Sequence, residues 1–116
     1  MLGVDLIEVC RIKQFIDSKT KQQLLRIFTQ REIDYAFASN NKYQRFAARF
    51  AAKEAFYKAF GSGNLYEIEL SHDNNKPIIK LYGITKELWN IKSYTCILVS
   101  VSHTKNYATA TVLINK

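Results

Sequence analysis

The sequence has few cysteines and no long apolar run. Only two cysteines, Cys10 and Cys96, occur in 116 residues, and their spacing matches no metal-binding motif. Both lie in runs typical of strands, so we predict small, reduced core residues and assign them no chemistry. No segment approaches the roughly 20 apolar residues that span a bilayer. The first apolar stretch is interrupted by Asp5 and Glu8 and lacks the basic start and cleavage site of a signal peptide. We therefore expect a soluble, cytoplasmic protein without a membrane partner.

Acidic residues are also scarce relative to basic ones. The chain has 10 Asp and Glu against 17 Lys and Arg, a formal net charge of +7 at pH 7. Such an excess indicates an anionic partner: a nucleic acid, a phosphorylated small molecule or an acidic protein. Charge alone does not choose among these three.

The length suits a single domain, residues 1–116, built around one core. Thr29 followed by Glu32 matches a capping box and predicts a helix from residue 30 to about 38. A long helix containing residues 45–60 should end at Gly61, where a left-handed cap is readily adopted. Shorter helical pieces are expected within residues 12–28, interrupted near 18–20, and at 83–91. The predicted strands are residues 2–9, which we expect to be buried, 66–70, 78–82, 96–103 and 107–114.

These elements predict an α+β fold, a compact single domain with one long central helix packed on an antiparallel sheet. The last four strands form two hairpins, because a polar turn separates each pair. No internal repeat, linker or low-complexity segment interrupts the chain.

The long helix has too few hydrophilic sides for a surface helix. At about 100° per residue, one side of the helix carries Phe46, Phe50, Tyr57 and Phe60 with Lys53 among them, and the opposite side carries Ala48, Ala52, Ala55 and Ala59. A helix that is apolar on nearly every side is usually buried. It nevertheless carries Glu54 and Lys58 one turn apart, beside the small Ala47 and Ala51. An ordinary surface ion pair is one interpretation. A ligand site is the other, and we favour it because buried charges need partners.

Asp5 is a second unexpected charge, because it lies within an apolar predicted strand. Alone it is more typical of a satisfied polar residue than of a ligand. Together with Glu54 and the surrounding basic residues, it makes an oxygen-ligand site suited to Mg²⁺ held mostly by water and substrate phosphates. Two weaker signals are the glycine-flanked turn at residues 61–63 and His103. The turn could offer amides to phosphate or simply stop the helix, and His103 could bind a ligand or only end a strand.

Three ordered motifs resemble the holo-[acyl-carrier-protein] synthases, the small bacterial branch of the 4′-phosphopantetheinyl transferases. Residues 3–12, GVDLIEVCRI, are similar to the opening G-[IVL]-D and E-x-x-R-[IV] motifs. Residues 49–59, RFAAKEAFYKA, match the central R-[FW]-A-x-K-E-A-x-x-K-A motif, and residues 99–114 match the closing strand-turn-strand motif. The resemblance spans almost the whole chain, and the central motif is the most specific.

The resemblance implies transfer of the 4′-phosphopantetheine arm from coenzyme A to a serine of apo-acyl carrier protein, in fatty acid biosynthesis, with release of adenosine 3′,5′-bisphosphate. It implies that Asp5 and Glu54 hold Mg²⁺, and that Glu54 helps remove the serine proton, directly or through a metal-bound water. It implies that Lys58 contacts the phosphate and stabilises the departing oxygen. The residues implied to line the nucleotide and phosphate pocket are Arg49, Lys53, Gly61, Ser62, Gly63 and His103.

The resemblance also implies two protein partners. Family members form homotrimers with active sites between protomers, and Arg11 matches the position that meets the acidic carrier protein. We add Arg26, Lys13 and Lys21 to this docking surface from charge alone. Ala48, Asn40, Asn41 and a shortened segment after Gly63 depart from the family pattern, all near the expected nucleotide pocket.

Two alternatives remain at this point. A small basic nucleic-acid-binding module would explain the net charge and the seven tyrosines, but it leaves Asp5 and Glu54 unexplained. A catalytically silent trimer that only binds coenzyme A is the other.

Overall fold

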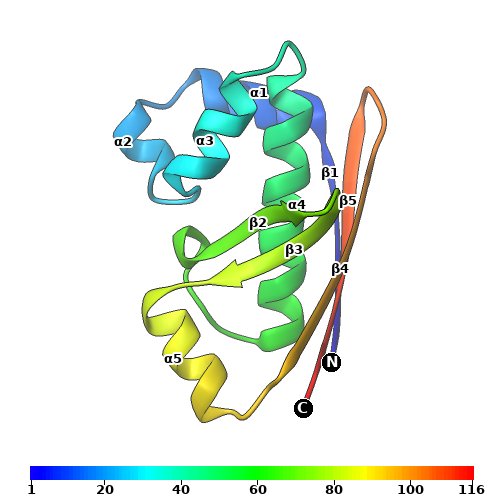
Figure 1. Cartoon of the computed structure of the whole chain (residues 1–116). Coiled ribbons are helices and arrows are strands. Elements are labelled where there is room, and N and C mark those ends of the chain that lie inside the picture. Colours follow the sequence, from blue (N-terminus) through cyan, green and yellow to red (C-terminus); the bar gives the residue numbers. More distant parts are fainter.

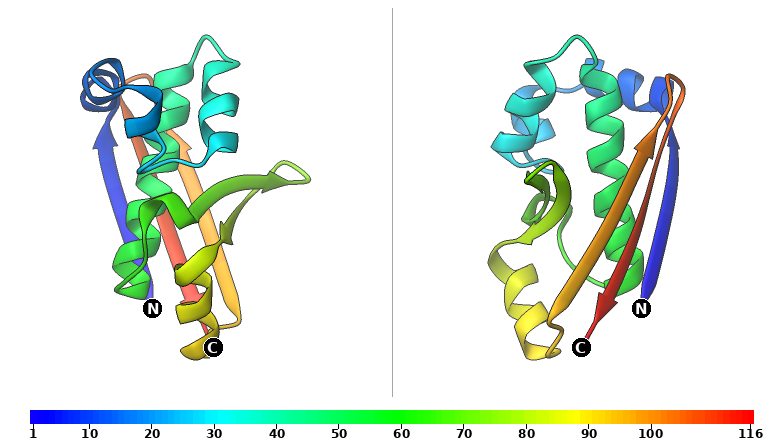
Figure 2. Two further views of the ribbon diagram at one scale, coloured as in Figure 1. Left: turned by 90° about the vertical axis from the view of Figure 1, so that its left-hand side faces the viewer. Right: turned by 45° about the vertical axis from the view of Figure 1, so that its right-hand side comes forward.

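The computed structural model describes residues 1–116 and is organised around one long helix, α4 (Lys42–Phe60) (Figure 1). A three-stranded antiparallel sheet, in the order β1-β5-β4, covers one side of α4, and a separate hairpin of β2 and β3 crosses the other side (Figure 2). The sheet strands are β1 (Leu2–Glu8), β4 (Cys96–His103) and β5 (Tyr107–Asn115). The remaining elements are α1 (Val9–Asp17), α2 (Lys21–Leu24), α3 (Gln30–Phe37), the 3-10 turn Leu65–Glu67, β2 (Ile68–Asp73), β3 (Lys76–Leu81) and α5 (Gly83–Ile91). The predicted fold class is confirmed, with the strands divided between two sheets.

Gly3 determines how closely β1 approaches α4. A Cβ atom at this position would lie 1.9 Å from the carbonyl oxygen of Ala55, so only glycine permits the contact. Because strand side chains alternate, Asp5 points to the same side as Gly3, toward α4. The expectation of a buried strand is wrong for its other face, where Leu2, Val4 and Leu6 are exposed.

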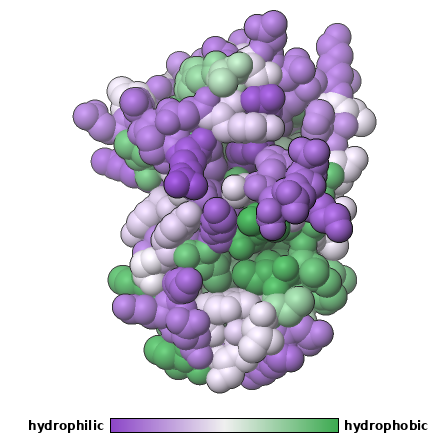
Figure 3. Space-filling view, viewed as in Figure 1, coloured by the Kyte–Doolittle hydropathy of each residue, from purple (hydrophilic) through white to green (hydrophobic).

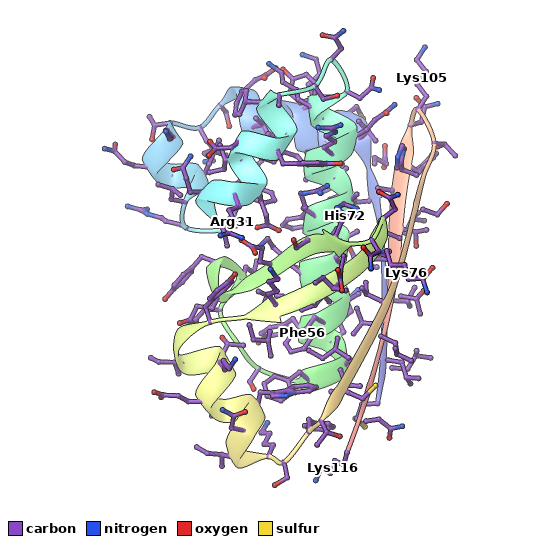
Figure 4. All side chains as sticks on the ribbon, viewed as in Figure 1. Arg31, Phe56, His72, Lys76, Lys105 and Lys116 are labelled. Carbon is purple, nitrogen blue, oxygen red and sulfur yellow. The ribbon has the colours of Figure 1, made fainter.

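Helix α4 is buried on most of its sides, as its sequence predicts. Ala51 and Ala55 pack in one core cluster with Val112 of β5, because small side chains let the helix approach the sheet. Phe56 belongs to the same cluster and contacts Trp89 of α5, with ring centroids 6.0 Å apart. Figure 4 shows Phe56 enclosed between α4, the hairpin and α5. Burial of each such aromatic ring stabilises the fold by about 2–3 kcal/mol.

Local signals correctly predict the start of α3 and the end of α4. The capping box is present, since Thr29 Oγ1 accepts from the Glu32 backbone N–H and the Glu32 carboxylate accepts from that of Thr29. Gly61 has a φ of +83° and ends α4. The first hairpin differs from expectation, because its turn is only Asn74 and Asn75, both with positive φ, and its strands are therefore longer at the turn.

The cysteines agree with the prediction only in part, since neither is a buried core residue and only Cys96 lies in a strand. Cys10 is exposed on α1 and does not lie in a strand, while Cys96 is half-buried at the start of β4. Both are free thiols. None of the helices combines the length and the apolar character that a membrane crossing would need.

Candidate functional site

Asp5, Glu54 and Lys58 come together where β1 lies on α4. The Lys58 ammonium donates to Asp5 Oδ1 at 3.1 Å and to the carbonyl oxygen of Val4 at 3.2 Å. The Asp5 side chain is 15% exposed and that of Lys58 is 53% exposed. The strand carboxylate is therefore largely covered, while its partner remains open to solvent.

Glu54 lies one turn before Lys58 at a cavity of about 680 Å³. Burial raises the pKa of the Glu54 carboxyl, and the nearby charge of Asp5 raises it further, while Lys58 opposes both. Asp5, Glu8 and Arg11 also line this cavity. Its other walls are mostly apolar: Leu6, Ile7, Ile12, Phe15, Ile27, Phe50, Leu65 and Tyr107. We call it the carboxylate cavity.

The donor set of the carboxylate cavity fits a magnesium ion that is only partly held by protein. No group of three or more His, Cys, Asp or Glu side chains in the chain could hold a metal. Mg²⁺ is commonly bound through one or two carboxylates together with water and substrate phosphates, which is what Asp5 and Glu54 offer. A site of this kind would be completed by a phosphorylated ligand.

A second cavity of about 420 Å³ lies on another side of α4. Arg45, Arg49, His72 and His103 line it, and no carboxylate does. Arg49 is only 4% exposed, and its Nε has no hydrogen-bond partner. Burial lowers the pKa of the Arg49 guanidinium, which still remains charged. We call this the cationic cavity, and its composition suits an anion.

The structure thus places two of the predicted pocket residues, Arg49 and His103, in one cavity, although they come from α4 and β4. The cavity also contains Ala48 and Asn41, two of the positions that depart from the family pattern. Arg49 and Glu54 are five residues apart, which separates them by about 140° around the helix. The two cavities have no lining residue in common.

Lys53 is not a pocket residue, which corrects the expectation from the resemblance. Its side chain is fully buried, with the ammonium 2.5 Å from the Glu32 carboxylate. It also donates to the carbonyl oxygens of Leu65 and Ile68, so all three of its hydrogens are used. Burial lowers the pKa of Lys53, and Glu32 opposes this. Lys53 therefore joins α3, α4 and β2 in the core.

The glycine-flanked turn behaves as a helix stop in this structure. The Gly61 backbone N–H donates to the Tyr57 carbonyl oxygen at 2.7 Å. The Ser62 hydroxyl is buried without a partner, and Gly63 has a φ of +114°. None of the three residues lines either cavity, so their contact with phosphate stays a prediction.

The predicted docking residues are exposed around α1 and α2. Arg11 is exposed and is one of the residues that line the carboxylate cavity. Lys13 is already paired with Asp17 at 2.9 Å. Lys21 and Arg26 are exposed and form no ion pair.

Sequence reasoning missed Tyr35 and His72 at the cationic cavity. Tyr35 lies on α3, and His72 lies near the end of β2. No spacing rule connects either residue with α4, because only the packing of α3 and the hairpin against that helix brings them together. Arg45, one turn before Arg49 on α4, is half-buried and also lines the cavity.

Known proteins match this chain over nearly its whole length. The family model described as "4'-phosphopantetheinyl transferase superfamily" matches residues 1–112. The chain is 42% identical to a holo-[acyl-carrier-protein] synthase of Ruminiclostridium cellulolyticum, over 99% of this chain and 91% of the relative. It is 40% identical to one of Chlamydia caviae, over 94% and 91%.

Solved structures agree in fold. The Helicobacter pylori holo-[acyl-carrier-protein] synthase in complex with coenzyme A aligns with a TM-score of 0.85 and 27% identity, over 99% of this chain and 100% of that one. The Neisseria meningitidis enzyme aligns with a TM-score of 0.90 and 26% identity, over 99% and 97%.

Proposed function

The chain belongs to the holo-[acyl-carrier-protein] synthase branch of the 4′-phosphopantetheinyl transferase superfamily, and we propose that it modifies an acyl carrier protein. It transfers the 4′-phosphopantetheine group from coenzyme A to a serine hydroxyl of the apo-carrier. The serine oxygen forms a bond to the phosphorus that bears pantetheine. The bond from this phosphorus to the bridging oxygen breaks, and adenosine 3′,5′-bisphosphate leaves with the electron pair.

The grouping of Asp5, Glu54 and Lys58 carries this proposal. Lys58 is half exposed, so its ammonium can contact the diphosphate and stabilise negative charge on the departing oxygen. Glu54 takes the serine proton, because its carboxylate faces the cavity one helical turn from Lys58. Mg²⁺ held by Asp5 and Glu54 would supply further charge neutralisation at the diphosphate.

We propose that one coenzyme A molecule contacts both a carboxylate cavity and a cationic cavity. The carboxylate cavity has apolar walls that suit the pantetheine arm and a charged end that suits the diphosphate. Arg49 and His103 in the cationic cavity bind the nucleotide portion. Because the two cavities lie on different sides of α4, we propose that a neighbouring protomer supplies the second one.

An exposed apolar face supports such an assembly. The outer side of the three-stranded sheet presents Leu2, Val4, Leu6, Leu98 and Leu113. A contiguous apolar surface on a sheet is typical of protein interfaces. We propose a homotrimer that buries this face and forms its active sites between protomers.

The acidic carrier protein is proposed to approach along α1 and α2. Arg11 lies at the carboxylate cavity, and Arg26 and Lys21 add positive charge nearby in the chain. Such a surface accelerates encounter with an acidic partner and weakens as salt increases. By its family, the reaction would serve fatty acid biosynthesis in the cytoplasm.

The sheet face disfavours the nucleic-acid alternative. Its outward residues on β1, β5 and β4 include one aromatic, Tyr107, and no lysine or arginine. A sheet that stacks single-stranded bases needs several exposed aromatics interleaved with basic residues. Tight binding of random single-stranded RNA at physiological salt would nevertheless count against the transferase.

Intact mass spectrometry of a purified apo-acyl carrier protein tests the proposal. The carrier is incubated with this protein, coenzyme A and Mg²⁺, beside a sample with a chelator. We expect a metal-dependent gain of one phosphopantetheine group. No gain with several different apo-carriers, while coenzyme A still binds, would instead support a silent binding protein.

A further inference from the structure

Tyr35 lies between two arginines at the wall of the cationic cavity. The guanidinium carbon of Arg45 is 3.9 Å from the centre of the Tyr35 ring, and that of Arg49 is 4.2 Å from it. A guanidinium at this distance from an aromatic face is attracted by the ring quadrupole. One ring thus holds two groups of like charge that would otherwise repel each other.

Each arginine is also held by a hydrogen bond to a backbone carbonyl oxygen, but each guanidinium keeps N–H groups that have no partner. Arg45 Nη1 donates to the Tyr35 carbonyl oxygen at 2.7 Å, and Arg49 Nη1 donates to the Arg45 carbonyl oxygen at 3.2 Å. Arg49 Nε is buried and has no partner. An unpaired buried donor is costly, so its presence beside a cavity without carboxylates indicates an anionic ligand.

His72 contacts the same ring from the hairpin. Its ring centroid is 5.8 Å from that of Tyr35, and Figure 4 shows it near the turn end of β2, beside α4. The charged or titratable groups around it are Tyr35 of α3, Arg45 and Arg49 of α4, and His103 of β4. On its own hairpin, Asp73 pairs in register with Lys76. Figure 3 shows mostly hydrophilic residues on the upper half of the molecule and exposed hydrophobic residues below the hairpin.

We propose that Tyr35 is a positioning residue that holds Arg45 and Arg49 as a preformed clamp for the ribose phosphate monoester of coenzyme A, with His72 as a pH-dependent third donor. The inference rests on the proposed function, because it assumes coenzyme A as the ligand. A phosphate monoester carries close to two negative charges at neutral pH and accepts several hydrogen bonds, which matches two guanidiniums. The diphosphate belongs with Lys58 in the other cavity.

The proposed pH dependence has a definite sign. Burial lowers the pKa of His72, and the charges of Arg49 and Arg45 lower it further, so the free protein holds His72 neutral at neutral pH. A bound dianion favours the protonated imidazole. Binding therefore takes up a proton, and affinity should increase as pH falls from 8.5 to 6.5, where the phosphate is still mostly ionised.

Calorimetric titration with coenzyme A and with dephospho-coenzyme A tests the clamp. We expect wild-type protein to bind coenzyme A more tightly than dephospho-coenzyme A. Tyr35→Leu should lose about tenfold in affinity for coenzyme A, while its affinity for dephospho-coenzyme A should not change. Tyr35→Phe keeps the ring and should restore the preference. Thermal unfolding of each variant separates this effect from misfolding, because Tyr35 is 41% exposed and its replacement should leave the fold intact.

The same titrations at pH 6.5, 7.5 and 8.5 test His72. His72→Gln should flatten the increase in affinity toward low pH for coenzyme A, while dephospho-coenzyme A shows little change in either protein. Equal losses for both ligands in Tyr35→Leu, or an unaltered pH profile in His72→Gln, would overturn the inference and leave the proposed function standing. Failure of wild-type protein to bind coenzyme A at all would instead overturn the proposed function.

Discussion

The Lys58 ammonium lies 3.1 Å from Asp5 Oδ1, which links α4 to β1 across 53 positions of the chain. The lysine side chain is half exposed, so its ammonium is accessible to a bound phosphate. The carboxylate is largely covered and is aligned by the strand that Gly3 allows against α4. Lys58 is therefore a solvent-accessible cation beside an Asp5 carboxylate that is held in place by β1.

Replacement of Lys58 by methionine should reduce turnover by roughly 100-fold to 1,000-fold, the effect expected when one donor to a developing negative charge is removed. The melting temperature should change little, because a partly exposed ion pair contributes little to stability. Initial rates of carrier modification and thermal unfolding measure both effects. Lys86→Met, on the exposed surface of α5, is the matched control. Full activity in Lys58→Met would exclude its proposed role.

Glu54→Gln should lower turnover by roughly 100-fold to 10,000-fold, because a neutral amide accepts no proton. The same substitution should not lower the stability of the fold. The raised pKa means that the folded state favours protonated Glu54, so the stability due to this group is lost as pH rises through its folded pKa. The variant should therefore melt at the same or a higher temperature than wild-type protein at pH 7, and the difference should shrink toward pH 4.

Melting curves at several pH values, with Glu87→Gln as a control on the surface of α5, measure this difference. A Glu54→Gln protein that melts lower at pH 7 would contradict the assigned burial effect. One that keeps full turnover would remove Glu54 as the base.

Lys53→Met should destabilise the protein by about 3–5 kcal/mol, because it leaves the Glu32 carboxylate buried without its cation. Urea denaturation measures the loss. The double variant Glu32→Gln/Lys53→Met removes both charges and should recover part of it. Lys13→Met breaks an exposed pair instead and should have little effect on unfolding. A stable Lys53→Met protein that lost only coenzyme A affinity would restore Lys53 to the pocket.

Val4→Lys should dissociate the proposed trimer, because it puts a charge within the exposed apolar sheet face. Light scattering coupled to size-exclusion chromatography should give a trimer mass for wild-type protein and a smaller one for the variant. Ile84→Lys, at an exposed apolar position on α5, should keep the trimer. Carrier modification should fall with the assembly if active sites lie between protomers. A monomeric wild-type protein with full activity would disprove that arrangement.

Much of the fold could be predicted from the sequence, because the signals were local. The capping box at Thr29 and the stop at Gly61 each involve hydrogen bonds within one turn of helix. The charges of α4 pointed to Glu54 and Lys58, since a helix that is apolar on most sides cannot leave charged groups without partners. The family motif covers the same residues.

Only the tertiary structure determines which charged residues of α4 are buried and which face a cavity. Lys53 and Glu54 are neighbours in sequence, yet one forms a buried ion pair with Glu32 and the other faces a cavity. Adjacent helix positions point about 100° apart, so the surrounding elements determine which charge is enclosed. Likewise, Tyr35 and His72 meet only because α3 and the hairpin pack on the same side of α4. Contacts between residues distant in the chain depend on that packing, and no short sequence pattern specifies it.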